Sequence, residues 1–426
     1  MTAKKDKNPD GLLSARLLKK LLQEQPTPFY LYDAESFHKA CMDLRLVFSW
    51  NDRFELCFPA RMNPNPAILR VLADAGCQIL CGSEAELRLS RYADIDGAQM
   101  IYAPMAEDAH AGAYARRIGA AYLIDAPHAL PSVPPEHVLL SVNPGGSLQM
   151  DGRTVWDFEK SKLGMNADET VSMCRRFQAS GVESIGLAAF LRDQEFEPLR
   201  FFAVQEMLFH LAVRIKRELD LAVDSILISG GLGVGYRPSD NAPDLTAVSE
   251  RVRRSYETLL TPAGLTPKLI LAEGRLMAAK AGVLVSRVLA VKRQQTPLVI
   301  LDADCAQLLR EIAFGASHRL IAPLAPESRA KQLVRVAGAI PDLRDHFSGS
   351  FVLPELKLGE CVLILDTGAD GRSFVVKSLY PTLLALQQAH PTGVAGDAYA
   401  VGTTDNNVVY IWSTDTSEWV NIGALQ

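Results

Sequence analysis

A glycine-rich run is the stretch of this sequence with the clearest chemical potential. Residues Ser229–Gly235 read SGGLGVG and follow the apolar run Ser225–Ile228. Glycine lets backbone N–H groups converge on an anion, so such a run is typical of a phosphate-binding turn. Glycine-rich turns between a strand and a helix also occur without a ligand. A phosphate site and a purely structural turn therefore stay open as alternatives.

Two arginines follow other apolar runs and could serve the same site. The segment Glu273-Gly274-Arg275 comes after Lys268–Leu271, and its arginine could add a charge-assisted contact to a bound anion. Alternatively, its charges form a salt bridge that closes the fold. Arg61 ends the run that begins at Phe54 and is either an anion clamp or a wall residue paired with a carboxylate. Three more polar side chains fall near expected sites, although solvated loop charges explain the carboxylates more simply: Asp193, Asp370 and His318.

The spacing of the histidines and cysteines offers no further catalytic device. The chain has eight histidines and seven cysteines, and none of them suggests a Ser/His/Asp or Cys/His pairing. Cys77 and Cys81 are spaced like half of a zinc site, but no second Cys/His pair follows. We therefore predict no metal site and interpret the cysteines as buried free thiols.

Eight short apolar runs alternate with amphipathic, helix-like stretches in the first two thirds of the chain. Short, fully apolar strands alternating with helices indicate a parallel sheet covered by helices. Eight such units in about 220 residues favour a (β/α)₈ barrel, which needs about 250, over a doubly wound open sheet. The expected strands are Phe54–Cys57, Gln78–Leu80, Met100–Tyr102, Tyr122–Ile124, Val138–Val142, Ser184–Ala188, Ser225–Ile228 and Lys268–Leu271.

The pattern changes after Glu273, where strand-like runs follow one another without long helices between them. This indicates a second, mainly β domain. We divide the chain into an N-terminal helix and strand (1–30, with Phe29–Tyr32 pairing into the β domain), a barrel (31–280), a β domain (281–386), and a linker with a short Trp-containing β tail (387–426). A meander docked on the β domain is the favoured interpretation of the tail, and a small recognition module is the alternative.

Composition limits the classes of partner. The net charge is −5 and no basic tract interleaves with aromatic residues, so we expect no nucleic-acid partner. No apolar run approaches the roughly 18 residues of a membrane-spanning helix, and the first residues are charged rather than signal-like. The expectation is a cytoplasmic protein that does not bind membranes.

Motifs in a consistent order over residues 27–380 resemble the diaminopimelate decarboxylase group of fold-type III pyridoxal-phosphate enzymes. The resemblance implies an alanine-racemase-like TIM barrel with a C-terminal β domain, usually as a dimer. It also implies that Gly230, Gly231, Gly233 and Arg275 contact the cofactor phosphate. The motifs that carry it are Thr27–Asp33, Asn63–Pro66, Asn143–Gly146, Ser161–Gly164, Ser229–Tyr236, Gly274-Arg275 and Leu353–Leu356.

The positions that would carry the chemistry depart from the family pattern. Arg61 stands where the family has its imine lysine, and a guanidinium stays protonated with no lone pair for an imine. Ala188 stands at the position of a histidine beside the cofactor ring, and Ala272 at that of the glutamate that pairs with the pyridine nitrogen. The family cysteine and glutamate lent across the dimer align with Pro341 and Asp342. The closing Asp345 is retained, and Asp370 replaces an aromatic residue near the cofactor.

Three functional hypotheses follow. The first is a pseudoenzyme without covalent cofactor, acting as a binding or regulatory partner, as a homodimer or as a heterodimer with an active paralogue. The second is an active enzyme of this family with altered chemistry on an amino acid or phosphorylated molecule, using groups such as Lys162, Arg275 and His318. The third is an interaction protein that docks through residues 396–426. Non-covalent binding of pyridoxal phosphate or another small anionic ligand, with Arg61 among its contacts, stays open.

Overall fold

The computed structural model describes residues 13–106, 108–128, 135–143, 147–150, 152–157, 161–191, 196–237, 239–304, 307–308, 317–369, 376–393, 398–403, 407–413 and 418–423. Asp193, Asp370 and the Pro144–Gly146 part of one family motif lie outside these residues. In the part of the chain that is described, no helix combines the length and apolarity that crossing a membrane would require.

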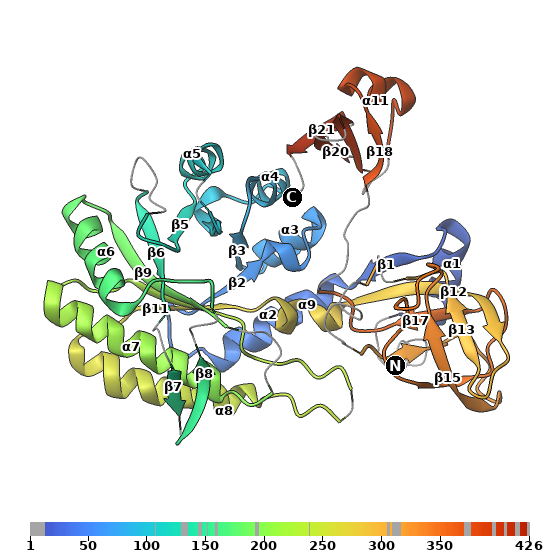
Figure 1. Ribbon diagram of the computed structural model, residues 1–426, viewed down its shortest axis with the longest axis horizontal. Helices are drawn as coiled ribbons and strands as arrows, with labels where there is room; N and C mark the ends of the chain where they lie inside the picture. Colours follow the sequence, from blue (N-terminus) through green and yellow to red (C-terminus); the bar gives the residue numbers. More distant parts are fainter. Residues whose placement is uncertain are drawn as a thin grey trace, which may run out of the picture. The chain divides into compact units, whose positions relative to one another are not determined.

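Eight parallel strands close into a barrel, which confirms the predicted fold class. The closed order is β10-β11-β2-β3-β4-β5-β6-β9, and each neighbouring pair is parallel. Figure 1 shows helices outside these strands. The strands are β2 (Glu55–Pro59), β3 (Gln78–Cys81), β4 (Met100–Tyr102), β5 (Ala121–Ile124), β6 (His137–Ser141), β9 (Ser184–Phe190), β10 (Ser225–Ser229) and β11 (Lys268–Ala272).

The barrel interior is filled by one buried cluster to which all eight strands contribute. Because neighbouring residues of a strand face opposite sides, the interior takes alternate residues from each strand. Six of the nine members are larger than alanine or cysteine, so the interior is packed rather than open. They are Cys57, Leu80, Ile101, Leu123, Leu139, Ala188, Leu227, Ile270 and Ala272.

The helices of the barrel begin at residues suited to capping. Asn65 accepts a hydrogen bond from the Ala67 N–H, and Pro66 takes the first helical position of α3. At α6, Asn166 and Glu169 form a reciprocal capping box. The helices of the first 260 residues are α1 (Ala15–Glu24), α2 (Ala34–Val47), α3 (Pro66–Asp74), α4 (Glu84–Tyr92), α5 (Ala109–Arg117), α6 (Ala167–Ala179), α7 (Leu199–Leu219) and α8 (Leu245–Ser255).

Two elements of the barrel unit were not expected from the sequence. Helix α2 precedes β2, and a two-stranded antiparallel sheet of β7 (Ser147–Met150) and β8 (Arg153–Asp157) lies between β6 and α6.

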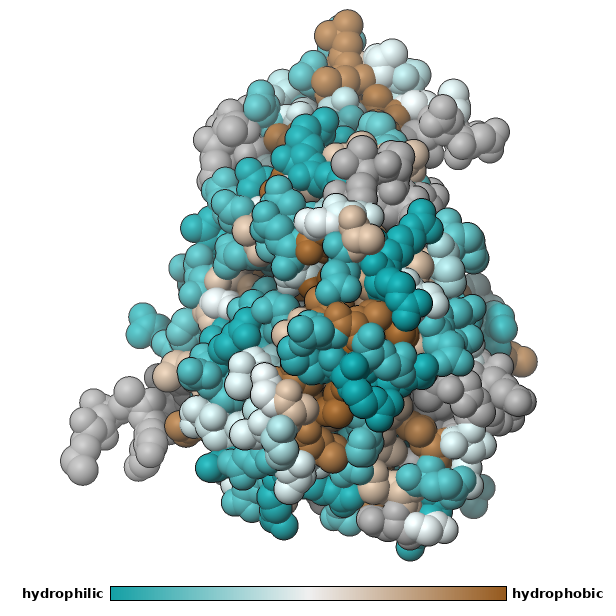
Figure 2. Space-filling model, turned by 90° about the vertical axis from the view of Figure 1, so that its left-hand side faces the viewer, coloured by the Kyte–Doolittle hydropathy of each residue, from teal (hydrophilic) through white to brown (hydrophobic). Residues whose placement is uncertain are grey.

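On the face drawn in Figure 2, hydrophilic residues surround a narrow central group of apolar ones.

A seven-stranded sheet forms the β domain. Its path is β14-β17-β12-β13-β15-β16, and β1 (Phe29–Tyr32) pairs antiparallel with β12. The N-terminal strand is thus part of this sheet. Helix α9 (Gly274–Ala278) precedes the domain. The other strands are β12 (Gly282–Lys292), β13 (Leu298–Leu301), β14 (Leu320–Ile321), β15 (Lys331–Ala337), β16 (Phe351–Pro354) and β17 (Cys361–Ile364).

The C-terminal residues form a sheet of their own, with a small separate core. Residues 376–380, which we had expected in the β domain, pair as β18 with β19 of this sheet, and part of the expected linker is helix α11.

Trp419 is 5% exposed, and its Nε1 donates to the His390 carbonyl at 2.8 Å. Tyr399 stacks on the His390 ring at 4.5 Å and meets Trp419 edge-on. The elements are β18 (Val376–Tyr380), α11 (Leu383–Ala389), β19 (Ala398–Gly402), β20 (Asn407–Ser413) and β21 (Glu418–Gly423).

We predict that Trp419→Ala unfolds this C-terminal sheet and leaves the barrel folded. Removing a buried tryptophan costs about 3–5 kcal/mol, more than so small a core sustains. Limited proteolysis with mass spectrometry should show new cleavage within residues 376–423 only. Leu384→Ala, at a position 63% exposed on α11, is the matched control and should stay resistant. Cleavage spread equally over the barrel would contradict a separate core.

Candidate functional site

The glycine turn lies at the carboxyl end of β10, where barrels place their chemistry. Gly230 and Gly231 have φ angles of +77° and +98°, which side-chain-bearing residues rarely adopt. A Cβ on Gly231 would also lie 2.6 Å from Leu191 Cδ1. Gly233 is buried in the same turn. Glycine is therefore required here by backbone conformation and by packing, whether or not an anion binds.

The described hydrogen bonds of this turn are made within the chain. The Gly230 N–H donates to the Ala272 carbonyl at 3.1 Å, which ties the turn to the end of β11. The Leu232 N–H donates to Glu273 Oε1 at 3.3 Å, and Glu273 is only 2% exposed. A carboxylate of the chain thus accepts from one backbone N–H of the glycine turn.

The alternation of strand residues fixes the orientation of Ala272 and Glu273. Ala272 belongs to the interior cluster, as does Ala188 of β9. Glu273 is the next residue after Ala272, so its side chain leaves the opposite side of the chain and reaches Leu232. The glutamate one place later therefore does not restore a carboxylate inside the barrel.

Arg61 lies just beyond β2 in a short 3-10 helix, Ala60–Met62. Its side chain is exposed. The acidic group that responds to its charge is Glu86 of α4. Burial raises the pKa of Glu86. Two groups oppose that rise: the Gly82 N–H, which donates to Glu86 at 2.6 Å, and the Arg61 guanidinium. The positive charge of Arg61 thus acts on a nearby carboxylate, as expected for a wall residue, without an ion pair between the two among the described contacts.

Three further predicted residues lie in the unit that contains the β domain. Arg275 is a half-buried residue of α9. Asp345 is 3% exposed, and its Oδ2 accepts the Ile340 N–H at 2.9 Å, which closes the turn after β15. His318 is 2% exposed, and its Nδ1 lies 3.0 Å from the Leu365 carbonyl. Asp345 and His318 thus have structural contacts in this unit.

Sequence reasoning missed a buried carboxylate beside His318. Asp366 is 1% exposed with a φ of +63°, and it pairs with Lys280 and Arg319 at 3.1 Å each. Lys280 also donates to the Gly235 carbonyl at 2.5 Å. The signal in the sequence was an aspartate two residues after the apolar strand β17.

A second missed group lines a cavity of about 690 Å³ at the carboxyl ends of β3 and β4. Glu84 accepts hydrogen bonds from Arg88 Nε and pairs with His110 Nδ1, both at 2.7 Å. Partial burial raises the pKa of Glu84, but the bonds from His110 and Arg88 outweigh it and hold the pKa below its ordinary value. The four-residue spacing of Glu84 and Arg88 was the available signal. Other lining residues are Ser83, Tyr102, Asp108, Val408 and Asn421.

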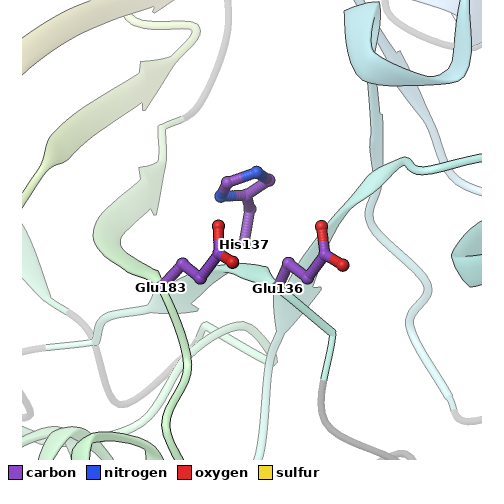
Figure 3. A group of neighbouring side chains, drawn as sticks. All are labelled: Glu136, His137 and Glu183. Carbon is purple, nitrogen blue, oxygen red and sulfur yellow. The ribbon is translucent and has the colours of Figure 1, made fainter.

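A third polar group stands at the amino ends of β6 and β9. Glu136, His137 and Glu183 are all exposed, and their potential ligand atoms lie within 4.8 Å of one another. Figure 3 shows the three side chains on the same side of the strands. The Glu136 carbonyl accepts the N–H groups of Glu183 and Ser184, so the strand pairing itself gathers them. They lie at the end of the barrel opposite the glycine turn, and we place no metal there.

Comparisons with known proteins agree on one family. A model of the pyridoxal-binding domain of pyridoxal-dependent decarboxylases matches residues 35–279, which include all eight barrel strands. Protein TabA of Pseudomonas amygdali pv. tabaci is 29% identical over 359 residues, covering 84% of each chain. Diaminopimelate decarboxylase of Deinococcus radiodurans is 29% identical over 369 residues, covering 85% of this chain and 89% of the relative.

The solved structures add the fold. Diaminopimelate decarboxylase from Helicobacter pylori, complexed with L-lysine, has a TM-score of 0.73 at 20% identity, covering 92% of this chain and 95% of that one. A diaminopimelate decarboxylase from M. jannaschii has a TM-score of 0.74 at 19% identity, covering 95% and 92%. At this level of identity, the likeness concerns the fold alone.

The residues at the carboxyl end of the barrel do not fit a pyridoxal phosphate held through an imine at the end of β2. The side chain there is the guanidinium of Arg61, which has no lone pair for condensation with an aldehyde. Ala188 and Ala272 present only methyl groups to the interior. The Leu232 N–H is already bonded to Glu273. No reaction step through this cofactor follows from these residues.

We predict that Arg61→Met raises the pKa of Glu86 further above its ordinary value, because the opposing positive charge is lost. Arg61→Lys keeps the charge and is the matched control. A carboxyl group with a raised folded-state pKa stabilises the fold fully below its unfolded pKa, and this contribution is lost as the pH rises through the raised value. The free energy of unfolding of Arg61→Met should therefore fall more than that of Arg61→Lys as the pH rises above 4.5, the ordinary value.

Carboxyl-carbon NMR titration of glutamate-labelled protein measures the shift directly. Superimposable Glu86 titration curves for the two variants would show that Arg61 does not act on this carboxylate.

Proposed function

Because the chain belongs to the pyridoxal-dependent decarboxylase family, we propose that it keeps the family fold, lacks amino-acid decarboxylase activity, and acts as a binding or regulatory protein. The observation that carries the proposal is the arginine at the end of β2, where the family resemblance places the imine lysine. Pyridoxal phosphate supplies an electron sink for carbanion chemistry when it is held and protonated correctly. The side chains at this position and in the interior provide no such hold.

The interior alanines support the same proposal independently of Arg61. Ala188 and Ala272 are 0% and 1% exposed and pack among aliphatic side chains. A histidine and a carboxylate would each need hydrogen-bonding partners at these positions. The apolar surroundings of the two alanines are consistent with a site no longer used for acid–base or charge-stabilising work.

A binding role is supported by the cavity at the ends of β3 and β4. Its volume of about 690 Å³ falls within the range of small-ligand sites. Glu84 and Asp108 are negative, whereas Arg88 is positive, so the lining suits a small molecule that carries both charges or hydrogen-bonding groups. The protein partner that we propose is a second copy of the chain or an active paralogue, by analogy with the family dimer.

We predict that purified protein incubated with pyridoxal phosphate shows no visible imine absorbance and no borohydride-trapped adduct. It should also release no carbon dioxide from diaminopimelate, lysine or ornithine above a heat-treated control. Arg61→Lys restores an amine at the end of β2, so a trapped adduct that maps to residue 61 in that variant only would support the proposal. An adduct on the unmodified chain would contradict it.

A second candidate function is altered chemistry by the same family scaffold, and Lys162 is the observation in its favour. This lysine is exposed on a loop that also contains Gly164. The Gly164 N–H donates to Oδ1 of Asp125, the residue directly after β5. An amine is therefore present near the carboxyl ends of the strands. Peptide mapping after borohydride treatment separates the two candidates, because a label on Lys162 that disappears in Lys162→Arg would favour the second.

We predict further that a small molecule binds in the β3–β4 cavity and raises the melting temperature in a thermal-shift assay. The rise should disappear in the double variant that carries His110→Ala and Glu84→Gln. These changes remove the hydrogen bond between the two side chains and the negative charge, and both positions lie on surface-facing helices. Screening amino acids and their phosphorylated derivatives is the measurement. His210→Ala, an exposed change on α7 away from the cavity lining, is the control. A ligand that stabilises all three proteins equally would not bind in this cavity.

A further inference from the structure

Two buried thiols touch each other beside the first barrel strand. Cys41 lies on α2 and Cys77 lies directly before β3, and their sulfur atoms are 3.4 Å apart. The residues are 1% and 0% exposed. Both are free cysteines in the structure, as the sequence predicted. Sulfur atoms in van der Waals contact need to move only by about 1.4 Å to reach the bonding distance of a disulfide.

The backbone around the pair holds the two sulfurs opposite each other. Arg45 lies one helical turn after Cys41, and its Nη2 donates to the Gly76 carbonyl at 2.7 Å. The Cys77 N–H donates to the Leu72 carbonyl at 3.0 Å, which fixes the turn between α3 and β3. The Arg45 contact thus joins α2 to residue 76, and the bond to Leu72 fixes the backbone of Cys77 locally. Together they hold the two segments that carry the thiols next to each other.

The two thiols share one hydrogen bond, in which either sulfur can be the donor. With Cys77 as the donor, this bond lowers the pKa of Cys41, burial opposes it, and the charge of Arg45 adds to the lowering. The shared bond and burial raise the pKa of Cys77. Burial also raises the pKa of Cys174 and of Cys361 to about 12. Among the described cysteines with a shifted pKa, Cys41 is the one shifted toward the thiolate, which is the reactive form.

We propose that Cys41 and Cys77 form a reversible disulfide when the protein meets a peroxide. The Cys41 thiolate attacks one peroxide oxygen, the O–O bond breaks, and the released hydroxide takes a proton to become water. Cys41 is then a sulfenic acid. The Cys77 sulfur attacks the Cys41 sulfur, the S–O bond breaks, and the hydroxyl leaves as water with the Cys77 proton. In sum, two thiols and one hydrogen peroxide give one disulfide and two waters.

The cross-link closes a loop that contains Arg61, one residue of the candidate site. Residues 41–77 include β2, the 3-10 helix with Arg61, and α3. Joining the ends of this segment removes conformational freedom from the unfolded chain, so it stabilises the folded state. The outer side of α2 is exposed, with Met42 at 60% and Leu46 at 74%. Oxidation of the buried pair requires local opening of this helix, through which a small oxidant would reach the sulfur atoms.

The test treats the full chain with excess hydrogen peroxide, quenches it, denatures it, and alkylates the remaining thiols. We expect five alkylated thiols instead of seven, an intact mass lower by two hydrogens before alkylation, and a peptide that joins Cys41 to Cys77. The melting temperature should rise by about 5 °C. Dithiothreitol should reverse all these changes.

Variants sharpen the result. Cys41→Ala and Cys77→Ala should each abolish the cross-link and the rise in melting temperature, whereas Cys174→Ala, another buried thiol, should retain both. The mapped cross-link in the unmodified chain decides the matter even where a variant folds poorly. Seven remaining thiols after treatment, a cross-link between other cysteines, or a sulfinic acid on Cys41 with Cys77 still reduced would each overturn the proposal.

Discussion

Closure of the eight-stranded barrel is the constraint on which the rest of the structure depends. Every strand must send alternate side chains into one shared interior, and the opposite side chains must pack under helices. Cys57, Ala188 and Ala272 are the small members of that interior, and they sit among leucines and isoleucines. The same alternation turns Glu273 out of the interior and onto the glycine turn, where it bonds the Leu232 N–H. The geometry of the candidate site is thus a consequence of barrel closure.

The parts of the fold that were predictable are those with a strong local signal. All eight barrel strands were expected because parallel strands buried on both faces leave short, fully apolar runs. Helix α2 was missed because its apolar residues are interrupted by charges, and much of its outer side, including Leu46, is exposed. Strand β14 has only two residues, and β18 pairs with a strand over 20 residues later in the chain. Neither feature leaves a periodic pattern to recognise.

The candidate site was predictable in position but not in its contacts. The glycine turn and Arg61 were expected at strand ends because a barrel places the loops after its strands at one end. The groups they contact depend on tertiary approach. Glu86 lies on α4, 25 positions beyond Arg61, and no local spacing connects the two residues. His110 reaches Glu84 from the next helix, and Lys280 reaches Asp366 across more than 80 residues. Such pairs are invisible in a single sequence.

The replacements in the interior also have a thermodynamic consequence. A buried histidine or carboxylate must find hydrogen-bonding partners, and leaving it without them costs about 1–3 kcal/mol. Alanine at positions 188 and 272 removes that requirement, and the neighbouring leucines and isoleucines keep the interior packed. A scaffold that no longer supports the reaction would therefore not lose stability through these two changes. This follows the general trade-off in which active sites are maintained at some cost to stability. Under the proposed function, retention of the fold is physically expected, because barrel closure depends on apolar packing and not on the residues that would do chemistry.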